Sequence, residues 1–188
     1  MGSCAKGVPG APDYCQCSWD LLLRVFSEKE LTAQEADPAK MASFKEKLAP
    51  TCGGKIPEPA AREKFVEECG AKTSELGPYC ECAWTELRKT LSVGDLVLPE
   101  SANSERVVAA TKTLPKSCGA KLPEKVAHAA FLEGCNGEKP GIEKFCECAW
   151  KQLRAMSSPA EIFAGTADVT GAKPKIQAQC GKLLPQKG

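Results

Sequence analysis

The residues with the clearest potential for chemistry are cysteines that stand in pairs separated by one residue. There are three such pairs: Cys15 and Cys17, Cys80 and Cys82, and Cys146 and Cys148. Two thiolates at this spacing can bind Cu(I) or Zn(II), and four cysteines can complete a tetrahedral site. Neighbouring thiols can also serve as the attacking and resolving groups of a thiol–disulfide oxidoreductase. In an oxidising compartment, the same residues form structural disulfides.

The other six cysteines repeat as regularly as the pairs. One cysteine stands 11 residues before each pair, and another follows 32 to 36 residues after it. The result is three sets of four at a period of 65–66 residues: Cys4, Cys15, Cys17, Cys52; Cys69, Cys80, Cys82, Cys118; and Cys135, Cys146, Cys148, Cys180. A structural role explains this uniform repetition better than a redox role, which needs one special pair. Metal binding is also less favoured, because CxxC knuckles and clustered histidines are absent from the sequence.

The first set suggests how the cysteines pair. Cys4 is present although the sequence has no helical segment before it to match those before Cys69 and Cys135. We therefore expect the leading cysteine of each set to pair within its own repeat, with one member of the CxC pair. The other member then pairs with the closing cysteine. Four cysteines allow three connectivities, and spacing does not say which CxC member takes which partner. A bond within CxC is the least favoured, because so small a ring strains the disulfide.

No catalytic constellation accompanies the cysteines. His128 is the single histidine, and the sequence has no Gly-rich phosphate loop or nucleophile elbow. The sequence therefore predicts a protein that is not an enzyme, with no catalytic residue, no cofactor and no metal site. Trp19, Trp84 and Trp150 each follow a CxC pair, and could form a stacking platform for sugars or bases. Because leucines follow them at helical spacing, we expect all three instead to be core residues of the repeats.

Helices must position these residues. Apolar residues recur at helical spacing after each CxC pair, and a second helical pattern leads into the closing cysteine. In the third copy, glycines and Pro174 limit this second helix to a short stretch near 175–180. Gly53, Gly119 and Gly181 follow the closing cysteines, where a left-handed cap residue is expected. A connecting helix is predicted at 60–69 and again at 124–135, but not before the first repeat.

These elements predict an all-α fold without strands. It consists of three tandem disulfide-stapled modules, at 1–58, 59–123 and 124–188, joined by connecting helices. Units of this size bury little apolar surface, so disulfides would be a condition of folding. Module 1 lacks the leading helix, and its uncovered end is a potential docking surface for a neighbouring chain.

Composition narrows the compartment and the partners. The chain has 188 residues, of which 43% are hydrophobic and 26% charged, with a net charge of +1. These values are typical of a globular protein and argue against a nucleic-acid partner. No apolar run is long enough to span a membrane. Twelve cysteines predict an extracellular, cell-surface or periplasmic location. The start Met1-Gly2-Ser3 is interpreted as replacing a cleaved signal peptide.

Tandem repeats without catalytic groups usually present a surface to a partner. The sequence therefore favours a non-enzymatic secreted or periplasmic protein with a structural or protein-interaction role. Its partner would be another protein or a second copy, and a subunit of a surface assembly or filament is one version. The alternative is a thiolate protein that binds Cu(I) or Zn(II) through its CxC pairs. A thiol–disulfide oxidoreductase is the third hypothesis.

Overall fold

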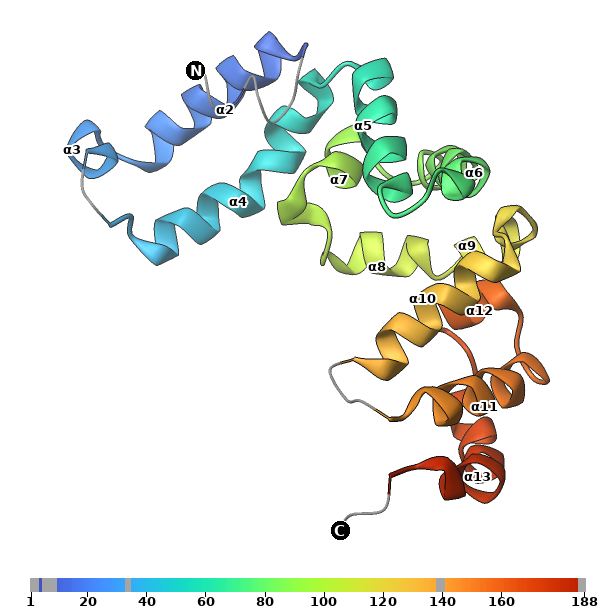
Figure 1. Ribbon diagram of the computed structural model, residues 1–188. Coiled ribbons are helices and arrows are strands. Elements are labelled where there is room, and N and C mark those ends of the chain that lie inside the picture. The colour runs from blue at the N-terminus through green and yellow to red at the C-terminus, as the bar shows by residue number, and fades with distance from the viewer. Residues whose placement is uncertain (1–3, 5–9, 33–34, 138–140, 186–188) are drawn as a thin grey trace. The chain divides into compact units, whose positions relative to one another are not determined.

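The computed structural model describes residue 4 and residues 10–32, 35–137 and 141–185 (Figure 1). In these segments the regular structure is entirely helical and no strand occurs, which confirms the all-α fold. None of the helices found there combines the length and apolarity that crossing a bilayer requires.

The CxC pairs lie in three corresponding helices: α2 (Pro12–Val25), α6 (Gly77–Leu87) and α11 (Glu143–Arg154). Each helix begins three residues before the first cysteine of its pair. The aromatic residue before the pair is buried in the first two copies, at Tyr14 and Tyr79.

The second helix of each repeat ends at or next to the closing cysteine. It is α4 (Pro38–Cys52) in the first copy and α13 (Val169–Cys180) in the third. In the second copy it is divided into α8 (Glu105–Thr111) and α9 (Leu114–Ser117).

The expectation of a short final helix near 175–180 is wrong. Helix α13 begins earlier because the Asp168 side chain caps it, accepting a hydrogen bond from the Gly171 N–H at 2.9 Å. Pro174 lies inside this helix without ending it.

The two predicted connecting helices are present. They are α5 (Glu58–Gly70) and α10 (Glu124–Asn136), and each begins directly after a proline with a glutamate as its first residue. The negative charge at this end suits the helix dipole. A 3₁₀ turn precedes each of them: η1 (Gly53–Lys55) and η4 (Gly119–Lys121), with η5 (Gly181–Leu183) in the corresponding place of the third copy. Two further 3₁₀ turns are η2 (Ser74–Leu76) and η3 (Pro99–Ser101).

Three short helices had not been expected: α3 (Glu28–Leu31), α7 (Val93–Val97) and α12 (Pro159–Phe163). Each follows a serine whose backbone N–H donates to a carboxylate three residues later, at 2.8–2.9 Å. The pairs are Ser27 with Glu30, Ser92 with Asp95, and Ser158 with Glu161. This reciprocal capping arrangement satisfies backbone donors that a short helix would otherwise leave unpaired.

The glycines after the closing cysteines are not left-handed caps, which corrects the expectation. Gly53 and Gly181 have φ values of −57° and −56°, and Gly119 is not among the residues with positive φ. At two of these positions, glycine is required because a side chain would come too close to a neighbouring helix. A Cβ on Gly53 would lie 2.7 Å from the Gly94 Cα in α7, and a Cβ on Gly119 would lie 3.0 Å from the Ala160 Cβ in α12. Nothing lies within 4 Å of the corresponding position at Gly181.

Contacts divide the chain into two compact units. The first is Met1–Ala71 with Trp84–Thr111, and the second is Lys72–Ala83 with Lys112–Gly188. Each unit contains one junction between consecutive repeats. In the first, α4 and η1 contact α7, which also contacts α5; in the second, α9 and η4 contact α12, which also contacts α10. The division into modules 1–58, 59–123 and 124–188 is based on the period of the sequence and stays a prediction.

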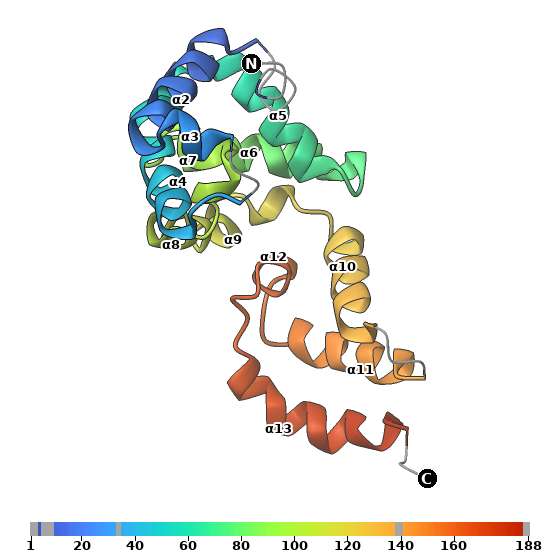
Figure 2. The same ribbon diagram turned by 90° about the vertical axis from the view of Figure 1, so that its left-hand side faces the viewer.

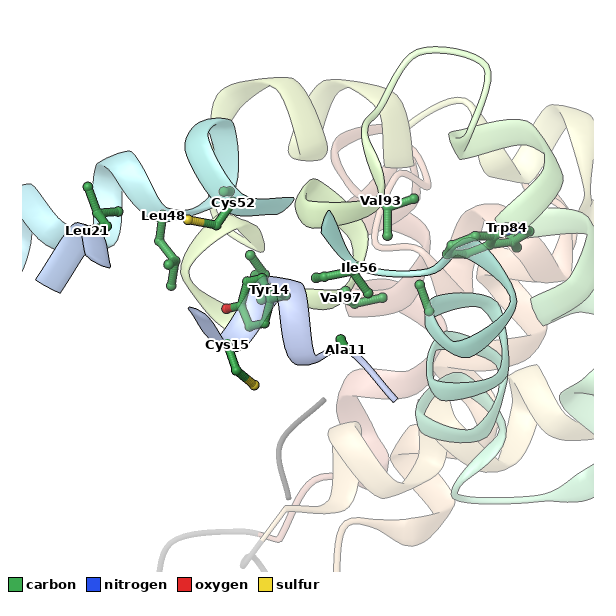
Figure 3. Packing of buried hydrophobic residues seen from close by; sticks show 13 residues of the cluster. Ala11, Tyr14, Cys15, Leu21, Leu48, Cys52, Ile56, Trp84, Val93 and Val97 are labelled. Atoms are coloured by element: carbon green, nitrogen blue, oxygen red, sulfur yellow. The ribbon is translucent and has the colours of Figure 1, made fainter. Parts of the chain in front are cut away.

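The core of the first unit is the best-defined apolar cluster. It joins Tyr14, Leu48 and Cys52 of the first repeat to Trp84 and Val97 of the second, as the side chains in Figure 3 show. Ile56, 4% exposed, belongs to the same cluster. Helices α2 and α4 run side by side in this unit (Figures 1 and 2), and α11 and α13 do so in the other.

Candidate protein-interaction surface

The described cysteines are all in disulfides. Five bonds are Cys4–Cys15, Cys17–Cys52, Cys82–Cys118, Cys135–Cys146 and Cys148–Cys180, with Cα–Cα distances of 5.6–5.8 Å. Cys69 and Cys80 are also disulfide-bonded, and no free cysteine occurs in this part of the chain. In the first and third repeats, the first CxC cysteine bonds the leading cysteine and the second bonds the closing one. This arrangement answers the question that spacing left open.

The buried position of the sulfurs bears on thiol chemistry. Cys52, Cys80, Cys118, Cys146 and Cys180 are fully buried. Burial and bonding protect these sulfurs from metals and external thiols, whereas the partner cysteines Cys17, Cys82, Cys135 and Cys148 are half-buried. Among the described residues, no group of three or more His, Cys, Asp or Glu side chains is arranged to hold a metal ion.

His128 takes part in packing between helices. Its ring stacks on Trp150 with 4.8 Å between the centroids, and its Nε2 lies 3.1 Å from a carboxylate oxygen of Glu147. His128 belongs to α10, whereas Trp150 and Glu147 belong to α11. The single histidine therefore helps to hold the connecting helix against the CxC helix.

Four contacts form one seam between α10 and α11. Besides the His128 contacts, the Phe131 ring lies 5.4 Å from the Trp150 ring, and Arg154 Nε donates to Glu124 Oε1 at 2.9 Å. Arg154 also donates to the backbone carbonyl of Ser157 at 2.7 Å. Trp150 is left only 6% exposed. The connecting helix thus covers the face of the CxC helix that carries the tryptophan.

The second repeat has the same arrangement. The Phe65 ring of α5 lies 5.4 Å from the Trp84 ring of α6, and Trp84 is 4% exposed. Glu58, the first residue of α5, accepts from the Arg88 guanidinium at 3.3 Å. Helices α5 and α10 each also contribute an alanine with almost no exposure, Ala61 and Ala127.

Trp19 differs from the other two tryptophans. It is 42% exposed, and Leu23, one helical turn further along α2, is 43% exposed. Trp19 is therefore not a core residue, which corrects the expectation. The physical reason is that Trp84 and Trp150 are buried by connecting helices, and no connecting helix of the described chain lies on α2. We call Gln16, Trp19 and Leu23 the open stripe, since their spacing places them on one face of α2.

The open stripe also differs in charge from the covered faces. Leu23 occupies the position of Arg88 and Arg154, and Gln16 occupies the position of Glu147. Gln16 makes a hydrogen bond within its own helix, to Asp20 at 2.8 Å. The two side chains that α11 uses for charged contacts with its connecting helix are thus uncharged in α2.

A signal for the open stripe was present in the sequence. The signal is Leu23, which stands where the other two repeats have the arginine that pairs with the connecting helix. The sequence also contains the Ser-x-x-Glu/Asp motifs that begin the short helices, but these helices were not predicted. The same is true of the glutamate–arginine ion pairs.

The other exposed large apolar residues do not form a comparable stripe on one helix. They are Val108, Met156, Phe163, Val169, Leu183 and Leu184. Phe163 contacts Tyr79 edge-on, with 6.0 Å between ring centroids. Burial of Tyr79 raises the pKa of its phenol. Isolated surface apolar residues are normal, whereas an aligned tryptophan and leucine call for an explanation.

No family model, curated protein or solved structure matches the chain. Its function is therefore argued from the cysteines and the open stripe.

Proposed function

We propose that this chain is a non-enzymatic protein-interaction module of an oxidising compartment, either extracellular, at the cell surface or periplasmic. The observation that carries the proposal is the pairing of the cysteines: they are in disulfides, and five of them are fully buried. Disulfides at this density persist only where thiols are oxidised. Because the sulfurs serve as cross-links, we expect the function to depend on the surface of the protein.

The disulfides make that surface rigid. Each CxC helix is tied to the segment before it and to the end of the second helix of its repeat. Loops of 11 to 36 residues are closed in this way. In the chain-entropy model, each closure of such a loop contributes about 3–4 kcal/mol by restricting the unfolded chain. A rigid helical face loses little conformational entropy on binding, which favours recognition.

The experiment is intact mass spectrometry of the unreduced protein, with and without an alkylating reagent under denaturing conditions. The proposal predicts a mass about 12 Da below the all-thiol value, with no label taken up, because six disulfides remove twelve hydrogens. A bound metal in a native spectrum, with alkylation in multiples of four, would instead support the thiolate metal protein. One rapidly reduced pair among inert disulfides would support the oxidoreductase.

A filament version needs the same contacts between copies that join the repeats within one chain. In the first unit, α7 supplies Val93, Gly94 and Val97 to its junction, all buried. The corresponding residues of the first repeat are Glu28 and Lys29 of α3 and Thr32 directly after it, and none of them is buried. This polarity disfavours a second copy at α3 and favours a partner that uses another face.

A further inference from the structure

We infer that the open stripe of α2 is a docking site for an amphipathic α-helix of a partner protein, seated as α10 is seated on α11. This inference deepens the proposed function and rests on it. Its first support is that the chain contains the occupied form of the site twice. In both cases the occupant is a helix that places a phenylalanine 5.4 Å from the tryptophan ring.

The contacts of α10 define the chemistry of the partner helix. Helix α10 runs antiparallel to α11, since its first residue Glu124 meets Arg154 and its later Phe131 meets Trp150. A helix on α2 in the same orientation would place an aromatic or large apolar residue against Trp19. Its first turn would then face Leu23.

The uncharged side chains of the open stripe restrict which helix can bind there. A glutamate as the first residue of the helix pairs well with Arg88 or Arg154. Against Leu23, the same glutamate would lose its hydration without gaining an ion pair. The partner helix is therefore expected to carry an apolar residue there. Gln16, in place of Glu147, likewise removes the requirement for a cation or histidine one turn later. The open stripe thus selects a more apolar helix than α5 or α10.

Helices α5 and α10 are not available as occupants. Phe65 and Phe131 already contact Trp84 and Trp150, so donating either helix to another copy would expose a buried tryptophan. A helix from a different protein carries no such cost.

The test uses the full disulfide-bonded chain and two synthetic peptides of residues 124–134, which end before Cys135. Both are held helical by a lactam bridge between the exposed positions 125 and 129, since free peptides of this length are barely helical. One peptide keeps Glu124 and the other carries Glu124→Leu. Neither peptide contains tryptophan, so emission from the protein reports on Trp19, the exposed one of its three tryptophans.

We expect the Glu124→Leu peptide to shift the emission to shorter wavelength with saturation, and to bind about tenfold more tightly than the parent peptide. Trp19→Ala should abolish the saturable shift. Leu23→Arg, which recreates the charge of Arg154, should reverse the preference in favour of the glutamate peptide. Val169→Ala is the matched control, because it removes an apolar side chain that is 57% exposed on α13. It should leave both affinities unchanged.

Three results would overturn the inference. The first is no saturable shift with either peptide, and the second is equal affinity for both peptides in the parent chain and in Leu23→Arg. The third is protection of Trp19 from acrylamide quenching in the free protein, because the stripe would then already be covered by the chain itself or by a second copy. Sedimentation across a concentration series separates those two occupants. Alkylation of the same sample tests the proposed function independently: uptake of label refutes that function, whereas resistant protein that binds no peptide refutes only the docking site.

Discussion

Helices α2 and α11 carry the same CxC-x-Trp arrangement, yet one face is open and the other is covered. On α11 the tryptophan is 6% exposed beneath α10, with an ion pair at one end of the seam. On α2 the tryptophan is 42% exposed, and a leucine replaces the arginine. Helix α2 is held by its disulfides to Cys4 and Cys52 and by its contacts with α4, and its tryptophan stays exposed. On α2, the side chains packed in the core, such as Leu21 and Cys15, are thus distinct from those of the tryptophan face.

The largest expected effect comes from removing the tryptophans one at a time. Trp150→Ala should lower the free energy of unfolding of its unit by about 3–5 kcal/mol, since it leaves a cavity under α10. Trp19→Ala should change the stability by no more than about 0.5 kcal/mol, as is usual at exposed positions. Urea unfolding followed by circular dichroism, with disulfides intact, measures both.

Trp84→Ala is the control for the tryptophan comparison, because Trp84 lies in the same compact unit as Trp19 and is 4% exposed. It should resemble Trp150→Ala. If Trp19→Ala proves as costly as Trp84→Ala, the open stripe is covered in solution and the difference between α2 and α11 disappears.

The next effect concerns the glycines where repeats meet. Gly53→Ala should cost about 1–3 kcal/mol, because the added Cβ would lie 2.7 Å from the backbone of Gly94, which cannot move aside cheaply. Gly181→Ala should be neutral or stabilise by about 0.4–1 kcal/mol, because its φ is −56° and nothing lies within 4 Å. Thermal unfolding of the two variants measures the difference. A costly Gly181→Ala would contradict the open space around a Cβ at this position.

The sequence predicted the CxC helices, the connecting helices and the three sets of cysteines, because these depend on local spacing. The CxC partners were not determined by spacing, since either sulfur of a pair could reach either partner. The close approach of Gly53 to Gly94 was also beyond reach, because it joins residues of different repeats and leaves no periodic pattern. Trp19 was misassigned for a related reason: helical spacing shows which residues share a face, but burial depends on whether another element covers that face.

A smaller effect is expected at the ion pair of the α10–α11 seam. Arg154→Leu copies the residue found at Leu23, and removes both the 2.9 Å contact with Glu124 and the 2.7 Å bond to the Ser157 carbonyl. We expect a loss of about 1 kcal/mol, most of it from the carbonyl left without its donor. The reverse change, Leu23→Arg, should alter stability by less than about 0.5 kcal/mol. Equal losses from the two changes, measured by urea unfolding, would show that α2 has a covering helix in solution.

The smallest expected effect is the loss of stability at low pH, which has a different cause in each of the two units. The Arg154 guanidinium lowers the pKa of Glu124 below 4.5, whereas Glu30 on α3 has a pKa of about 2, chiefly through its hydrogen bond from Lys40. A carboxyl whose pKa is lower in the folded state stabilises the protein above its unfolded pKa. That contribution is lost as the pH falls from 4.5 toward the folded value.

Arg154→Leu should therefore flatten the decrease in melting temperature below pH 4.5 for the second unit alone. The Glu30 contribution, lost between pH 4.5 and about 2, should persist in the first unit because it does not involve a connecting helix. Carboxyl chemical shifts in an NMR titration identify the two groups separately. If the pKa of Glu124 stays low in Arg154→Leu, the dipole of α10, and not the seam with α11, lowers that pKa. The contrast between a covered and an open CxC helix would then rest on the aromatic contacts alone.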